Sequence, residues 1–357
     1  MTNTLHLRIT HIQAETADTN SYYLESVDGQ PVAYLPGQFL TVILHPKGGE
    51  EAVEQEVRRS YSISSVPGEP LRMTIKRVEN GAISRYLLNT LRPGDVIECL
   101  APAGRFTLNR IEDKEPQDLL FIAAGSGITP VLSLIKAALT TTTAKLTLLY
   151  SNTRERGIIF REELNNLADL FPDRLQLVHL LSHPTQDGEG LKGTVRTGRL
   201  NNVLLETLLP TLLHGPLAAA ACFVCGPGDY MRMVQFTLVF SGMRAEQIHR
   251  ENFVVEPVFV SAPPVQSADR IVRLLFAEKE LSILVPAYKS ILQAALDEGV
   301  SLPYSCRGGR CSTCAGRCTS GQVHMTINDV LTERDLQQGW VLTCTGYPES
   351  DDVVIEF

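Results

Sequence analysis

The stretch of residues 119–130, LLFIAAGSGITP, decides the architecture of the middle of this chain. Its first six residues are all apolar, which is typical of a strand buried on both faces of a parallel sheet. Gly125 and Gly127 follow, and Thr129 and Pro130 suit the N-cap and the first position of a helix. Glycines let the backbone approach a pyrophosphate at such a helix N-terminus. We therefore predict a strand–turn–helix unit that binds a dinucleotide.

Apolar strands continue to alternate with helices downstream of this unit. Strands are predicted at residues 146–150, 175–180 and 221–224, and helices at 131–139 and 161–170. This alternation favours a Rossmann-like parallel α/β domain, which we place at residues 113–255. The turn GSGITP is not the Gly-x-Gly-x-x-Gly fingerprint, so the assignment depends on further motifs.

The flanking regions show other patterns. Residues 1–112 form short alternating runs separated by Pro-Gly turns, which is typical of an antiparallel β-barrel. Residues 256–270 are rich in proline and small residues, and we predict an interdomain linker there that lets the last unit move. Residues 271–357 form a short strand-rich unit with one helical stretch. The fold class is therefore multidomain, α/β plus β.

Composition excludes several classes of function. A length of 357 residues indicates about two or three domains. The net charge of −8 argues against a nucleic-acid partner. We expect no membrane span, because no run of about 18 uncharged apolar residues occurs. The N-terminus lacks the basic and then apolar pattern of a signal peptide, so we expect a cytoplasmic protein. The sequence does not indicate an oligomeric state.

Cysteines cluster near the C-terminus. Cys306-x4-Cys311-x2-Cys314, then 29 residues, then Cys344, has the spacing of plant-type [2Fe–2S] ferredoxins. Thiolates are the soft ligands that iron and sulfide favour. A structural zinc site usually has two Cys-x2-Cys halves, and only one is present here. Zinc, or no metal, are the alternatives. Cys318 is predicted to be a packing residue, with a role as a substitute ligand as the alternative.

Residues 303–309, PYSCRGG, and 343–345, TCT, also resemble the plant-type ferredoxin family. The resemblance implies a β-grasp ferredoxin domain at residues 271–357 and a [2Fe–2S] cluster on the four cysteines.

The run RSYS at residues 59–62 resembles the Arg-x-Tyr-Ser motif of the ferredoxin–NADP reductase family. An arginine can hold the pyrophosphate of a flavin through paired hydrogen bonds. The run GAIS at residues 81–84 resembles the second motif of that family, which opens a helix whose amides meet phosphates. The run PAGRF at residues 102–106 resembles a third. The resemblance implies a flavin, with FAD favoured over FMN, bound by Arg59, Tyr61, Ser62, Lys76, Gly81, Ala82, Ile83 and Ser84.

The run CGPGDYM at residues 225–231 resembles the nicotinamide motif of the same family. The resemblance implies that Cys225 lies at the hydride-transfer point; the alternative is a buried thiol at the end of a strand. The predicted nucleotide contacts are Gly125, Gly127, Thr129, Pro130, Gly226 and Pro227. Arg154 and Arg156 follow the second strand and favour NADPH over NADH, because arginine accommodates a 2′-phosphate. The alternative is two solvated arginines.

Together the three units resemble the reductases of multicomponent oxygenases, a group that includes the reductases of phenylacetyl-CoA epoxidase and of ketosteroid and alkane monooxygenases. The resemblance implies electron transfer from NAD(P)H through FAD and [2Fe–2S] to a partner, here an oxygenase such as phenylacetyl-CoA epoxidase. Eleven acidic and seven basic side chains from residue 271 onward suit a basic patch on that partner. The alternatives are a reductase of hybrid cluster protein and a stand-alone diaphorase or quinone reductase. We predict no general acid–base pair, because the cofactors supply the chemistry.

Overall fold

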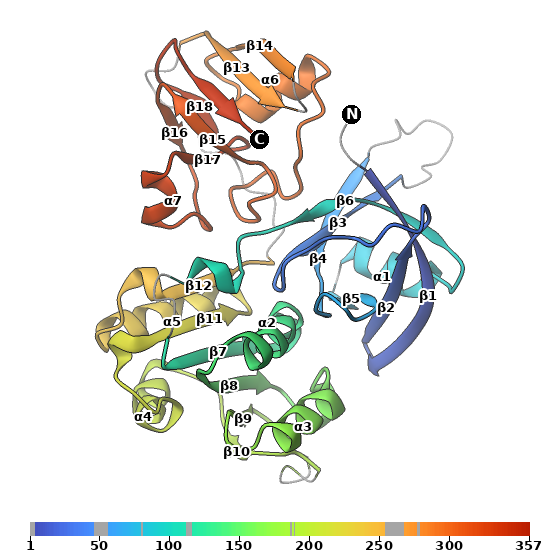
Figure 1. Cartoon of the computed structure of the whole chain (residues 1–357), viewed down its shortest axis with the longest axis vertical. Helices are drawn as coiled ribbons and strands as arrows, with labels where there is room; N and C mark the ends of the chain where they lie inside the picture. Colours follow the sequence, from blue (N-terminus) through green and yellow to red (C-terminus); the bar gives the residue numbers. More distant parts are fainter. Residues whose placement is uncertain are drawn as a thin grey trace.

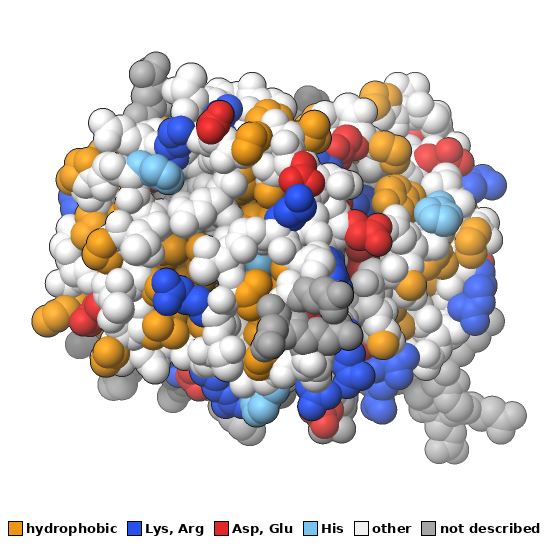
Figure 2. Space-filling model, turned by 90° about the horizontal axis from the view of Figure 1, so that it is seen from below, with side chains coloured by type: hydrophobic (Ala, Val, Ile, Leu, Met, Phe, Trp, Pro, Cys, Tyr) orange, Lys and Arg blue, Asp and Glu red, His pale blue; other side chains and the backbone are white. Residues whose placement is uncertain are grey.

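The computed structural model consists of three units, each built on its own sheet (Figure 1). It describes residues 4–45, 56–79, 81–111, 116–185, 188, 190–253, 268–276 and 279–357. Most of the linker predicted at residues 256–270 lies outside the described residues. None of the helices in the described ranges is long and apolar enough to cross a membrane. Seen from below, basic side chains gather along the lower edge of the molecule (Figure 2).

The first unit is an antiparallel barrel. Its elements are β1 (Thr4–Thr16), β2 (Thr19–Ser26), β3 (Phe39–Leu44), β4 (Val57–Ser62), β5 (Leu71–Lys76), α1 (Ala82–Thr90) and β6 (Val96–Ala103). The strand order is β4-β3-β6-β1-β2-β5. A bridge between Ile63, just after β4, and Met73 of β5 joins the two edges of the sheet. Alternate apolar side chains such as Leu7 and Leu40 fill the interior, so the predicted barrel is confirmed.

The second unit is a parallel sheet covered on both faces. Its strands are β7 (Asp118–Ala124), β8 (Lys145–Asn152), β9 (Leu175–Leu181), β10 (Thr194–Thr197), β11 (Ala220–Cys225) and β12 (Ile248–Glu251), in the order β10-β9-β8-β7-β11-β12. Helices α2 (Ile128–Thr141) and α3 (Arg161–Leu170) pack on one face. Helices α4 (Asn202–Leu212) and α5 (Gly228–Phe240) pack on the other. The predicted Rossmann-like domain is confirmed.

One local prediction is wrong in this unit. Helix α2 begins at Ile128 with Gly127 as its N-cap, so Thr129 and Pro130 lie inside the first turn. The physical reason is that residues Gly125–Gly127 already form a 3₁₀ turn, which leads directly into the helix. The Thr129 hydroxyl donates to the carbonyl of Ser126 at 3.0 Å instead of capping the helix. Pro130 is tolerated because the first amides of a helix have no partner within it.

The third unit has a mixed sheet packed against a helix. Its elements are β13 (Arg270–Phe276), β14 (Lys279–Val285), α6 (Ile291–Asp297), β15 (Ala315–Ser320), β16 (Val323–Met325), α7 (Glu333–Gln337), β17 (Trp340–Leu342), β18 (Gly346–Pro348) and β19 (Val354–Glu356). The main sheet has the order β14-β13-β19-β15-β17, with β13 and β19 parallel. Apolar residues of α6 and the sheet share one core. This arrangement is the predicted β-grasp ferredoxin fold.

A buried polar network fixes the barrel on the parallel α/β unit. The Arg72 guanidinium of β5 donates to the Glu163 carboxylate of α3 at 2.8 Å, and Lys136 of α2 donates to the same carboxylate at 2.7 Å. Burial alone would raise the pKa of Glu163, but Arg72 and Lys136 hold it below its ordinary value. Breaking such a buried pair strongly destabilises a protein. The network therefore helps hold the barrel and the parallel α/β unit together.

Candidate functional site

A cleft of about 1560 Å³ lies where the barrel meets the carboxyl ends of the parallel strands. Ligands of open α/β sheets bind at such a position. The predicted residues that line it are Arg59, Tyr61, Ser62, Lys76, Gly81, Ala82, Ile83, Ser84, Gly125, Thr129, Arg154, Arg156, Gly226 and Pro227. Gly127, Pro130 and Cys225 are not among the lining residues. The fold thus brings segments that are far apart in the sequence to one cavity.

The end of β4 supplies polar groups to the barrel side of the cleft. Ser62 is 2% exposed, and its hydroxyl has no hydrogen-bond partner among the described residues. A buried polar group without a partner is costly, so a ligand atom is expected there. Burial raises the pKa of Tyr61, which keeps its phenol neutral. An unpaired hydroxyl and a neutral aromatic ring beside Arg59 fit a flavin.

The N-terminus of α1 opens toward the same cavity. Gly81 is the N-cap and offers no side-chain cap to the first amides of the helix. These amides are therefore available to phosphate oxygens, which helix N-termini attract. The Ser84 hydroxyl accepts the amide of Val78 at 3.0 Å and holds the preceding turn in place. The arrangement fits the pyrophosphate of FAD.

Lys76 lies at the border between the two halves of the cleft. Its ammonium group is 3.7 Å from the carboxylate of Asp18. It also points toward the nucleotide turn, since a Cβ built on Gly125 would lie 4.0 Å from its Nζ atom. A cation in this position can contact a ligand in either half of the cleft.

The nucleotide turn depends on close backbone packing. Gly125 has φ +54°, and its carbonyl accepts the Tyr150 hydroxyl at 2.9 Å. A Cβ on Gly127 would lie 2.1 Å from the carbonyl oxygen of Cys225. Because no side chain fits there, the turns after β7 and β11 can approach each other. Gly127 thus acts by packing behind the cavity wall.

Cys225 is fully buried at the end of β11. It is paired in register with Glu251 of β12. Burial, and then the neighbouring Glu251, raises the pKa of the Cys225 thiol well above its ordinary value. Burial also raises the pKa of Glu251 to about 8. Both groups are therefore mostly protonated at neutral pH, and the role of Cys225 at the hydride-transfer point stays a prediction.

The far end of the cleft is basic. Arg154 and Arg156 are exposed on the loop after β8, and Arg199 joins them from the loop after β10. Glu155 lies between the first two arginines but turns inward, where its carboxylate accepts the amide of Thr185 at 3.0 Å. An acid that binds ribose hydroxyls would have to face the cleft. This end of the cavity therefore favours the binding of a phosphate group over the binding of ribose hydroxyls by an acid.

Sequence reasoning missed several lining residues, among them Asp18, Thr74, Ser126, Arg199, Asn201, Tyr230 and Phe253. Tyr230 lies inside the quoted CGPGDYM run and Ser126 inside the quoted LLFIAAGSGITP stretch, so these two motifs were the available signals. The Tyr230 hydroxyl is 3.0 Å from that of Ser151. Arg199 and Phe253 belong to loops whose positions depend on the tertiary fold.

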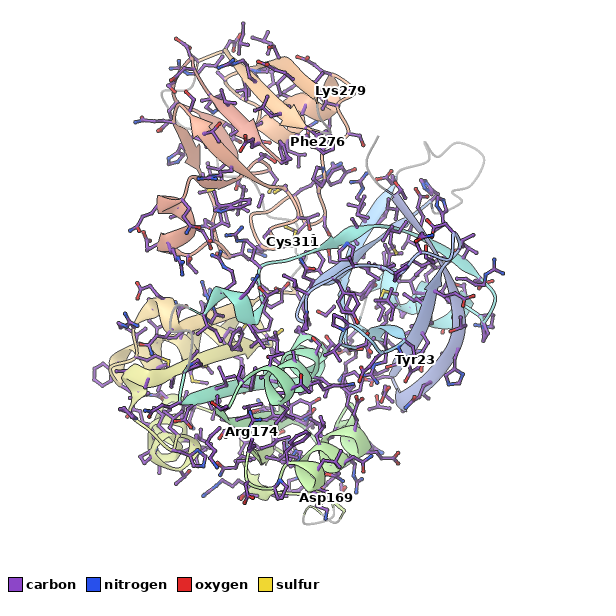
Figure 3. All side chains as sticks on the ribbon, viewed as in Figure 1. Tyr23, Asp169, Arg174, Phe276, Lys279 and Cys311 are labelled. Atoms are coloured by element: carbon purple, nitrogen blue, oxygen red, sulfur yellow. The ribbon has the colours of Figure 1, made fainter. Side chains whose placement is uncertain are left out.

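Cys306, Cys311 and Cys314 lie on the loop between α6 and β15, where Figure 3 labels Cys311, and Cys344 is close enough to hydrogen-bond with Cys306 and Cys314. Hydrogen bonds with Cys311 and Cys344 lower the pKa of Cys306. A hydrogen bond with Cys344 lowers the pKa of Cys314. Within the described ranges, no three His, Cys, Asp or Glu side chains surround a point as ligands of a single metal ion would. A two-iron cluster distributes its four sulfurs over both iron atoms.

Backbone amides point at these sulfurs. The amides of Gly308 and Arg310 donate to Cys306 Sγ at 3.4 Å, and that of Gly309 donates to Cys344 Sγ at 3.3 Å. Such donors stabilise anionic sulfur and tune the potential of a cluster. Gly309 has φ +72°, and its Cβ would lie 2.5 Å from the carbonyl oxygen of Ile327. The loop therefore fits the predicted [2Fe–2S] cluster.

Cys318 lies apart from this group. Its thiol donates to the carbonyl of Ser320 at 3.1 Å, and its side chain packs against the core of the third unit. These contacts fit the prediction of a packing residue.

Three family models match the chain in the same order as its three units. They are an oxidoreductase FAD-binding domain at residues 6–108, an oxidoreductase NAD-binding domain at 121–236 and a 2Fe-2S iron-sulfur cluster binding domain at 276–349. These matches confirm FAD, a nicotinamide dinucleotide and [2Fe–2S] as the cofactors. They also decide between the iron–sulfur and zinc alternatives.

Known proteins resemble the chain over its full length. A component of the 1,2-phenylacetyl-CoA epoxidase from Escherichia coli K12 is 34% identical, with 100% of this chain and 98% of that protein covered. The ferredoxin reductase component of 3-ketosteroid-9-alpha-monooxygenase from Rhodococcus rhodochrous is also 34% identical, with 98% and 96% covered. The solved structure of phthalate dioxygenase reductase shares the fold, with a TM-score of 0.57, 23% identity, and coverage of 99% of this chain and 98% of that one. The chain therefore belongs to the family of FAD- and [2Fe–2S]-containing ferredoxin reductases that serve as reductase components of multicomponent oxygenases.

Proposed function

We propose that this reductase takes electrons from NADPH and delivers them, one at a time, to an oxygenase component that acts on phenylacetyl-CoA. Identity of 34% to the component of the Escherichia coli epoxidase over the whole chain supports this partner. The observation that carries the electron-transfer role is the direct contact between the flavin-binding strand and the cysteine loop. The Ser60 hydroxyl donates to the Ser305 hydroxyl at 2.8 Å, and Ser305 precedes the cluster ligand Cys306.

Different segments of the chain bind different parts of the cofactors. Arg59 and the amides at the start of α1 bind the phosphates of FAD, while Tyr61 and Ser62 orient its ring. The turn at residues 125–127 and the Cys225-Gly226-Pro227 segment place the nicotinamide against that ring. When bound by these residues, FAD would supply the capacity to take up a hydride and to give up electrons one at a time. The protein contributes binding, orientation and electrostatics.

Three arginines support NADPH as the electron donor. Arg154, Arg156 and Arg199 all line the basic end of the cleft. Arginine binds phosphate through paired, charge-assisted hydrogen bonds. Glu155, the acid that could select NADH, is buried and bonded to Thr185. We also place the protein in the cytoplasm and in phenylacetate catabolism, because reduced thiols suit a reducing compartment and one close relative belongs to a phenylacetyl-CoA epoxidase.

Reconstitution tests this function. Purified reductase would be mixed with NADPH, phenylacetyl-CoA and the oxygenase components of the Escherichia coli epoxidase, and the epoxide would be measured by mass spectrometry. Product that requires the reductase supports the proposal. If no epoxide forms, but the reductase supports hydroxylation of a ketosteroid by the oxygenase of the steroid system, the partner is a steroid oxygenase instead. Fast reduction of quinones with no oxygenase served would indicate a stand-alone reductase.

A further inference from the structure

The cysteine loop of the third unit rests on one face of strand β4. Besides the Ser60–Ser305 hydrogen bond, the Arg58 guanidinium lies over the ring of Tyr304, 3.9 Å from its centroid. The Tyr304 hydroxyl donates to Glu56 at 3.4 Å. Arg58 and Ser60 thus contact the cysteine loop, and Ser60 also lines the flavin cleft beside Arg59 and Tyr61.

A second set of contacts lies on α7. Asp335 is 1% exposed, and one of its carboxylate oxygens accepts hydrogen bonds from both Arg105 and Arg110. The two arginines belong to the segment that leaves the barrel after β6. The other oxygen of Asp335 accepts the amide of Thr332 at 3.0 Å. The guanidinium of Arg105 also lies over the ring of Trp340, 4.2 Å from its centroid.

The chemistry of this contact is ionic. Burial lowers the pKa values of Arg105 and Arg110 to about 10, so both remain charged at neutral pH. Removing the partners of a buried charge strongly destabilises the folded arrangement. Asp335 would be such a charge without its arginines, because its own helix satisfies only one of its oxygens. The position of the third unit therefore depends strongly on this pair.

We propose that Arg105 and Arg110 are positioning residues for internal electron transfer, which hold the ferredoxin unit through Asp335 so that its cysteine loop stays on the flavin-binding strand. In this step one electron leaves the NADPH-reduced flavin and one ferric iron of the cluster becomes ferrous; no atom is transferred. The arginines touch neither cofactor site. They act by keeping the Ser60–Ser305 contact formed.

The test uses the holoenzyme and the variant Arg105→Gln/Arg110→Gln. Its matched control is Arg8→Gln/Arg92→Gln, which removes two exposed arginines of the same barrel. After anaerobic mixing with NADPH, bleaching of the flavin and of the cluster are followed separately. We expect the flavin to be reduced at the parent rate. Reduction of the cluster should be slower by about tenfold or more, because a smaller fraction of the molecules has the ferredoxin unit docked. Arg105→Lys/Arg110→Lys, which keeps the charge, should restore most of the rate.

Trp340 gives a readout that is independent of activity, because it is the only tryptophan of the chain. Loss of the Arg105 contact should make its fluorescence more accessible to acrylamide in the glutamine variant and not in the control. Cluster reduction at the parent rate with Trp340 newly accessible would show that docking does not limit the transfer. Slow reduction with Trp340 unchanged would show that the arginines do not hold the unit. Because no oxygenase is present, neither outcome bears on the identity of the partner.

Discussion

Replacing Glu251 with Gln should change how the stability of this reductase depends on pH. Glu251 ends β12 beside Cys225, and burial raises its pKa from the ordinary 4.5 to about 8. The folded protein therefore holds a proton that the unfolded chain releases above pH 4.5. Stability from this group is fully present below that pH and is lost as the pH rises toward 8.

The magnitude follows from the two pKa values. A difference of one in pKa corresponds to about 1.4 kcal/mol, so the full effect above pH 8 is about 5 kcal/mol. Between pH 5.5 and pH 8 the cost to the folded state grows by about 3 kcal/mol. Glutamine has nearly the same shape and no titrating proton. The variant should therefore lack this loss.

The assay is urea unfolding of the FAD-loaded protein at about pH 5.5 and pH 8, followed by the fluorescence of released flavin. The parent should lose about 3 kcal/mol more than Glu251→Gln over this range. Glu206→Gln, on the exposed side of α4, is the matched control and should behave like the parent. Equal pH dependence in the parent and in Glu251→Gln would refute a buried, protonated carboxyl at this position.

Three further predictions concern the cofactor sites. Cys311→Ser should remove the visible absorption of the cluster and its iron, abolish reduction of the protein acceptor, and still let NADPH bleach the flavin; full acceptor reduction would contradict the assigned route. Gly127→Ala should cost about 1–3 kcal/mol in urea unfolding and raise the KM for NADPH, because its Cβ would meet the Cys225 carbonyl. Gly228→Ala, whose Cβ meets nothing within 4 Å, should do neither, and equal effects would rule out the packing argument. Arg154→Ala should raise the KM for NADPH about tenfold and leave that for NADH nearly unchanged; equal changes would mean that the 2′-phosphate lies elsewhere.

Local signals predicted the three folds and much of the cleft. The run LLFIAA is typical of a doubly buried strand because both faces of β7 are covered by helices. The cysteine spacing was informative because three ligands lie on one loop. Backbone amides of that loop donate hydrogen bonds to the sulfurs. In each case the residue types and spacing of a short stretch were sufficient for the prediction.

Long-range contacts explain what the sequence could not reveal. Glu155 lies between Arg154 and Arg156 in the sequence, but its carboxylate accepts the amide of Thr185 on a later loop and does not line the cleft. Arg199 and Phe253 reach the cleft only because their strands lie in the same parallel sheet. The start of α2 was misplaced because the glycine turn that precedes it is itself helical.

Strand β4 carries a motif that the sequence analysis interpreted only in part. The run RSYS was interpreted through Arg59, Tyr61 and Ser62, which line the flavin cleft. Ser60 lines the same cleft and also donates to Ser305 of the cysteine loop, and the preceding Arg58 lies over the ring of Tyr304. One side chain of the motif, Ser60, therefore contacts both the flavin cleft and the loop that holds the cluster. The closeness of the two redox sites therefore follows from the position of β4, whose C-terminal half lines the flavin cleft while Arg58 and Ser60 contact the cysteine loop.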